Sequence, residues 1–191
     1  LVDTLKALGS EKATPLLAEL NTIHAGGGSP AVKAAKSLEA ATKGGMPPLD
    51  AANLAKTLYP EATAEVEKFR QFTTVLSNLD SVRSQLAEPL AIWAKLENIQ
   101  PVDISDRAGF MSLLGAAMEK LQSPMDDRRE LQELKSHIDR LGGGHMAAQA
   151  DEIAKIDSST LERLEKFTTT ISGGVFSKQI TEPTRPLYIS Y

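Results

Sequence analysis

The sequence predicts a mainly α-helical fold, a compact multi-helix bundle of about eight to ten helices. Two observations lead to this prediction. Apolar residues recur every three or four positions through most of the chain, which is the spacing of one helix face. Groups of glycine and proline interrupt this spacing, and Ser, Thr or Asp stand where new helices would begin. With 191 residues, 41% of them apolar, the chain can bury a full core as a single helical domain over residues 1–191.

Three helices are expected in the first third of the chain. Each begins at a Thr, Ser or Asp side chain that can accept a hydrogen bond from a free backbone N–H. Each ends at glycine or proline, which do not continue a helix. The expected starts and ends are Thr14 to Gly26, Ser29 to Gly44, and Asp50 to Pro60.

The middle of the chain carries two long apolar runs, 66–79 and 82–96. Asp80 and Ser81 offer a cap between the runs, so they are either antiparallel neighbours or one bent helix. Pro89 lies inside the second run, where it removes a backbone donor and should kink the helix. At helical spacing Trp93 shares an apolar stripe with Leu86, Leu90 and Leu96, and it is expected in the core.

Four more helices are expected in the second half, again from caps, apolar spacing and glycine stops. Their expected extents are Ser105 to Leu121, Ser123 to Gly142, Ile153 to Ile156, and Ser159 to Gly173. The chain then changes character, because 175–180 and 187–191 are rich in β-branched and aromatic residues around the two prolines of 181–186. This pattern predicts a short C-terminal β-hairpin or an extended arm docked on the helices.

Composition excludes several classes of function. The chain has no cysteine, which rules out a disulfide framework, a thiol nucleophile, a Cys-ligated zinc and a thioester intermediate. The formal charge of −4 argues against nucleic-acid binding by bulk charge. No apolar stretch is long enough to predict a transmembrane segment. The chain begins at Leu1 instead of Met, so we expect it to be a fragment of a longer protein.

No spacing of polar residues predicts a catalytic site, a metal site or a cofactor. His137 and His145 are eight residues apart across Gly142–Gly144, whereas a metal-binding helix usually places ligands three or four apart. The serines stand mainly at helix starts, and no nucleophile elbow is present. Gly26–Ser29 with Lys33 suggests either a linker or a phosphate cradle, but no P-loop pattern is present.

Charged residues between 126 and 135 alternate in sign. That pattern is typical of a solvated helix face, or of a charged docking face for a partner. In the segment 110–115, the apolar residues cover more than one face of a helix. Such a helix either lies deep in the core or presents an apolar patch to a partner. We assign the candidate partner-binding residues here: Phe110, Leu113, Leu114 and Gly115.

The stretch Leu113-Leu114-Gly115 supports a resemblance to a known family. In a cysteine-free, Ala- and Gly-rich helical module of this size, it resembles the helical ubiquitin-ligase domain (XL-box) of the Xanthomonas outer protein L family of bacterial type III effectors. A short His-Leu-Gly stretch is associated with the activity of that domain. Leu114 and Gly115 match its leucine and glycine, while Leu113 stands in place of the histidine.

The resemblance implies a bacterial type III effector domain that is secreted into the host-cell cytoplasm. It would act as a cysteine-independent E3 ubiquitin ligase, docking a host E2 charged with ubiquitin and orienting the thioester for attack by a substrate lysine. The alternative hypothesis is a non-enzymatic helical interaction or structural module. Exposure of Phe110, Leu113 and Leu114 would favour a docking patch, and their burial would remove its main support.

Overall fold

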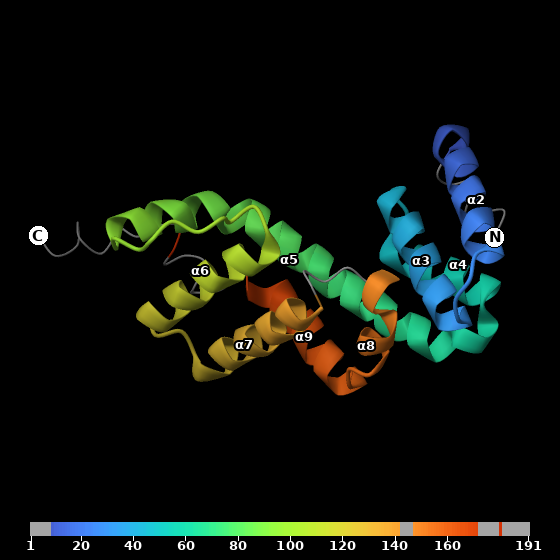
Figure 1. Ribbon diagram of the computed structural model, residues 1–191. Coiled ribbons are helices and arrows are strands. Elements are labelled where there is room, and N and C mark those ends of the chain that lie inside the picture. Colours follow the sequence, from blue (N-terminus) through green and yellow to red (C-terminus); the bar gives the residue numbers. More distant parts are fainter. Residues whose placement is uncertain (1–8, 142–146, 172–179, 181–191) are drawn as a thin grey trace, which may run out of the picture. The chain divides into compact units, whose positions relative to one another are not determined.

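The structure is a computed structural model that describes residues 9–141, 147–171 and 180 (Figure 1). These residues form eight α-helices and two short 3₁₀ helices, and no strand occurs among them. The mainly helical fold class is therefore confirmed. Of the expected C-terminal hairpin or arm, only Ile180 is described, and it is helical and buried. The rest of 172–191 lies outside the described residues, so the hairpin stays a prediction.

The chain divides into two compact units, which are considered separately. Unit 1 comprises the chain up to Thr74 together with His145–Leu161, and unit 2 comprises Val75–Gly144 together with the chain from Glu162 onward. Two of the boundaries fall inside helices, one in α5 (Thr63–Leu96) and one in α9 (Ser158–Thr170). The single domain over 1–191 stays a prediction.

Unit 1 is built around α3, which packs against every other short element of the unit. Its elements, besides the first part of α5, are α2 (Ser10–Ala25), α3 (Pro30–Lys43), α4 (Pro48–Leu58), η1 (Pro60–Ala62), η2 (Ala147–Gln149) and α8 (Ala150–Ala154). Alanine dominates the buried faces of α3 and α4, with six side chains fully buried: Ala34, Ala35, Ala41, Ala51, Ala52 and Ala55. Small side chains let two helix backbones approach closely, so α3 and α4 make the most extensive contact in the unit.

Unit 2 has a core of larger side chains. Its elements are the second part of α5, α6 (Arg107–Lys120), α7 (Met125–Arg140) and most of α9, and α6 packs on α7. The fully buried side chains include Leu86, Leu90, Phe110, Met111, Leu114, Met118, Leu131, Leu134 and Ile138. The long helix α5 runs unbroken from 63 to 96, through Pro89, so the two apolar runs form one helix and not an antiparallel pair.

The predicted helix starts are correct in position to within a few residues, but most predicted caps are wrong. Ser29 does cap α3, its Oγ accepting a hydrogen bond from Val32 N at 3.2 Å. Elsewhere another residue occupies the cap position: Gly9, five residues before Thr14; Pro47, three before Asp50; Asp106, directly after Ser105; and Pro124, directly after Ser123. Each of these starts lies in a cluster of turn-forming residues, and the tertiary contacts select which of them ends the loop.

The predicted cap at Ser159 is also wrong, because α9 begins one residue earlier, at Ser158. Asp157 precedes the helix, and its carboxylate accepts hydrogen bonds from Ser159 N at 3.4 Å and Ser159 Oγ at 3.0 Å. A carboxylate in this position both accepts from a free N–H and complements the positive end of the helix dipole.

Candidate functional site

The last three turns of α5 are apolar on two opposite sides. Leu86, Leu90 and Trp93 are buried in the core of unit 2, with at most 3% of each exposed, which confirms the predicted position of Trp93. On the other side Ile92 is 52% exposed and Leu96 is 63% exposed. The expected inward position of Leu96 is therefore wrong: at 100° per residue, Leu96 already lies outside the arc that Leu86, Leu90 and Trp93 cover.

The chain after α5 turns back and passes beside that exposed side (Figure 1). Asn98 adopts a positive φ of 56°, and Ile99 N donates to Ala94 O at 2.9 Å, which ends the helix. An irregular segment, 99–104, follows and leads to Asp106, the cap of α6.

Asp80 anchors the far end of this segment to α5. Its carboxylate accepts two hydrogen bonds from Arg107, at 3.0 and 2.8 Å, and one from Arg83 at 3.2 Å. Arg83 also donates to Ser105 O. Gly109 allows the close approach, because a Cβ there would lie 1.8 Å from Asp103 O. Bidentate arginine pairs fix geometry well, so 99–104 is held beside α5 at both of its ends.

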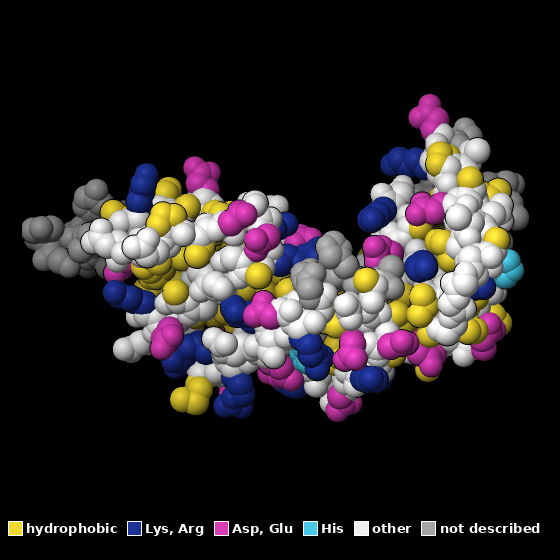
Figure 2. Space-filling model, viewed as in Figure 1, with side chains coloured by type: hydrophobic (Ala, Val, Ile, Leu, Met, Phe, Trp, Pro, Cys, Tyr) yellow, Lys and Arg dark blue, Asp and Glu magenta, His cyan; other side chains and the backbone are white. Residues whose placement is uncertain are grey.

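Between α5 and 99–104 lies a groove of about 300 Å³, which we call the α5 groove. Ile92, Val102 and Leu113 are among the side chains that line it, and Val102 is 43% exposed. Figure 2 shows hydrophobic side chains exposed among charged ones over the C-terminal end of α5, at the left of the view. The volume is at the small end of the range for sites that bind small molecules, and the groove is open.

Two opposite charges line the same groove. Glu88 and Lys95 both lie on α5, seven residues and therefore about two turns apart, on the face that also carries Ile92. Both side chains are exposed, and neither forms an ion pair or a side-chain hydrogen bond with any described residue. The α5 groove therefore presents an apolar centre between an acidic and a basic residue.

Of the four partner-binding residues assigned from the sequence, three are buried in the core of unit 2. Phe110, Leu113 and Leu114 are 0%, 3% and 0% exposed, so the core alternative is confirmed and an exposed apolar patch at these side chains is wrong. They are buried because α6 is covered on one side by α7 and contributes to the core of unit 2. Leu113 nevertheless lines the α5 groove.

Gly115 lines a different groove of about 330 Å³, together with Met125, Arg128 and Arg129. Met125 is 68% exposed. A Cβ at Gly115 would meet Leu131 Cδ2 at 3.6 Å, an ordinary contact, so the packing of α6 on α7 does not require glycine here.

The residues of the α5 groove that sequence reasoning missed are Glu88, Ile92, Lys95 and Val102. A signal for Ile92 was present, because Ile92 falls between the stripe positions Leu90 and Trp93 and cannot share their buried face. The return of 99–104 beside α5 leaves no comparable signal, since it depends on the distant pairing of Asp80 with Arg107.

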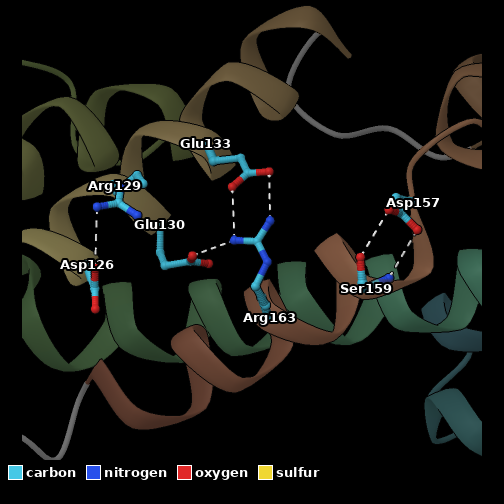
Figure 3. Close-up of polar contacts among 7 residues, drawn as sticks. All are labelled: Asp126, Arg129, Glu130, Glu133, Asp157, Ser159 and Arg163. Atoms are coloured by element: carbon cyan, nitrogen blue, oxygen red, sulfur yellow. Dashed lines mark hydrogen bonds and ion pairs between the residues drawn. The ribbon is translucent and has the colours of Figure 1, made fainter.

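The charged segment on α7 serves the structure of unit 2. Arg163 of α9 reaches between Glu130 and Glu133 of α7, and it donates to Glu133 at 3.1 and 3.2 Å and to Glu130 (Figure 3). These hydrogen bonds raise the pKa of the Arg163 guanidinium above its usual value. Arg129 pairs with Asp126 at 3.5 Å on the same helix. The two glutamates thus join α7 to α9 and are not available as an unoccupied acidic pair.

The other polar candidates also have structural partners. Lys33, beside the glycines, donates to His24 O at 3.0 Å, and so helps to satisfy the carbonyls at the end of α2. His137 Nδ1 lies 3.0 Å from Arg140 Nη2, and His145 lies outside the described residues. Over the described ranges, no three His, Asp or Glu side chains are grouped as metal ligands would be. In the same part of the chain, no helix has the length and apolarity that crossing a bilayer requires.

The chain was compared with protein families, curated proteins and solved structures. No protein-family model, no curated protein and no solved structure matches the chain.

Proposed function

We propose that this chain is a non-enzymatic protein-interaction module, and that the α5 groove binds an amphipathic helix of a protein partner. The observation that carries the proposal is the exposure of Ile92 and Val102 within one groove. Large apolar side chains that gather at one place on a surface mark interaction sites far more often than scattered ones do.

The groove favours a helix over a small molecule. A partner helix offers apolar side chains at positions i, i+3, i+4 and i+7, which can cover a straight apolar strip along α5. Glu88 and Lys95 then favour one direction of the partner, with a basic residue beside Glu88 and an acidic residue beside Lys95.

A selection experiment tests this proposal even while the partner is unidentified. A displayed library of amphipathic helical peptides is selected on the wild-type chain and counter-selected on Ile92→Glu. We expect enriched peptides that carry apolar residues at helical spacing and shift the NMR resonances of Ile92 and Val102. The matched control is Leu49→Glu, because Leu49 is 60% exposed on α4 and lies outside the groove. No enrichment, or peptides that bind Ile92→Glu equally well, would contradict the proposal.

The ubiquitin-ligase hypothesis is a specific form of the same proposal, in which the partner is a host E2 charged with ubiquitin and the chain is a domain of a type III effector. What supports it is the cysteine-free helical sequence. Because Phe110, Leu113 and Leu114 are buried, the E2 would dock on the exposed residues of the α5 groove instead. Its rate gain would come from orienting the thioester, because the chain has no thiol of its own.

Incubation with E1, a panel of E2 enzymes, ubiquitin and ATP tests this form. We expect ubiquitin chains with the wild-type chain and with Leu49→Glu, and few with Ile92→Glu. An absence of chains with every E2 would overturn the ligase hypothesis and leave the interaction module standing.

A further inference from the structure

We infer that the helix that fills the α5 groove is α5 of a second copy of this chain, packed antiparallel across a two-fold axis between Ala91 and Ile92. This inference rests on the proposed function, because it names the partner of the same groove. Three features of the α5 face support it: the spacing of its residues, its charges and its exposed apolar side chains.

The residues of this face form one continuous strip. Glu88, Ala91, Ile92 and Lys95 stand at positions i, i+3, i+4 and i+7 of α5, and all four line the groove. All four are exposed in a single copy. The strip thus has the amphipathic pattern that the proposed function expects of a partner helix.

The strip is also complementary to itself. In a two-fold antiparallel pair, residues equally distant from the axis face each other. Glu88 then faces Lys95 of the second copy, and Lys95 faces Glu88 of the second copy. Nearer the axis, Ala91 faces Ile92 of the second copy, so that a small side chain stands opposite a large one. Both ends of the strip carry opposite charges, and its centre is apolar.

The charges also exclude the other direction. In a parallel pair in register, Glu88 would face Glu88 and Lys95 would face Lys95, and both contacts would repel. The antiparallel pair converts the same residues into two attractive contacts.

Charge reversal tests the inference, with molecular mass measured by sedimentation equilibrium over the micromolar range. We expect the wild-type chain to dimerise, and E88K and K95E each to weaken the dimer about tenfold or more, because two like-charged contacts replace two attractive ones. The double variant E88K/K95E restores the dimer, because each contact again joins opposite charges. An equal mixture of the two single variants also restores it, as a mixed dimer. E19K and K36E, exposed reversals on α2 and α3, serve as controls and should leave the dimer unchanged.

The absence of cysteine gives a second, independent measurement. Mild oxidation of an E88C and K95C mixture is expected to give a cross-linked mixed dimer, and each variant alone should give much less of one. A parallel pair would give the opposite result, because each cysteine would then face the same position in the second copy. Each variant alone would cross-link, and the mixture would give little mixed dimer.

Two results overturn self-pairing: a wild-type chain that stays monomeric, or a double variant as weak as the single ones. If the library still yields peptides that depend on Ile92, only self-pairing fails and the interaction module stands. If neither a dimer nor such a peptide is found, both proposals fail.

Discussion

The two units reach a buried core by different means. Unit 1 packs α3 against α4 through alanines, and unit 2 packs α5, α6, α7 and α9 through Phe, Leu, Met and Ile. Alanine limits how much apolar area a contact can bury, but it allows close and extensive backbone contact. Large side chains bury more area, and in unit 2 they are numerous enough that α5 carries apolar residues on a second, exposed side. The candidate site thus lies where apolar residues exceed what the core can cover.

This difference makes unit 2 sensitive to loss of volume. Phe110 is fully buried, so Phe110→Ala should lower the free energy of unfolding by about 3–5 kcal/mol, through lost burial and the cavity left behind. Urea denaturation followed by circular dichroism measures the change. Leu17→Ala is the control, because Leu17 is 47% exposed and should cost roughly 0.5 kcal/mol or less. A loss no larger at Phe110 than at Leu17 would show that the core of unit 2 is placed wrongly.

Unit 1 should instead be sensitive to gain of volume. Ala35 on α3 is fully buried, and Ala35→Leu inserts three heavy atoms where two helices already lie close together. We expect a loss of about 1–3 kcal/mol in the free energy of unfolding, measured as above. Ala18→Leu, on the exposed face of α2, adds the same atoms without crowding and should change stability little. Equal effects at the two positions would contradict close packing through alanine.

Gly115 on α6 is a position in unit 2 where added volume should stabilise the chain. Gly115 lies inside a helix with room for a Cβ, so Gly115→Ala should raise the free energy of unfolding by about 0.5–1 kcal/mol. Gly28 is the contrasting position, because its φ of +122° is one that alanine rarely adopts. Gly28→Ala should therefore destabilise the chain. Destabilisation at Gly115 would mean that α6 and α7 lie closer together than the structure places them.

The sequence predicted the helices well, because the spacing of apolar residues is a local property that packing preserves. It predicted caps less well. At Ser105, for example, the neighbouring Asp106 makes the cap, because Ser105 bonds to Asp103 instead. The candidate site was harder still. The spacing of apolar residues indicated that the helix at 110–115 is apolar on two sides, and the C-terminal end of α5 is apolar on two sides as well. The spacing does not indicate which of these two helices is covered by an element from elsewhere in the chain. The contact of α6 with α7 buried the first, and the second remained exposed.

The smallest expected effect concerns pH, and it belongs to unit 2 alone. Partial burial lowers the pKa of His137 below its usual value, and the nearby Arg140 charge adds to this. The unfolded chain therefore binds more protons at His137 than the folded chain does, so stability rises with pH in the interval between the two pKa values. This contribution is complete above the usual histidine pKa of about 6.5, and it is lost as the pH falls from there through the lower folded value.

We expect His137→Gln to flatten the dependence of the urea midpoint on pH in that interval. Arg140→Gln should flatten it only in part, because burial is the larger cause. If Arg140→Gln removed the pH dependence as completely as His137→Gln, the Arg140 charge and not burial would be the main cause of the lowered His137 pKa. His137 would then be less buried in unit 2 than the structure shows.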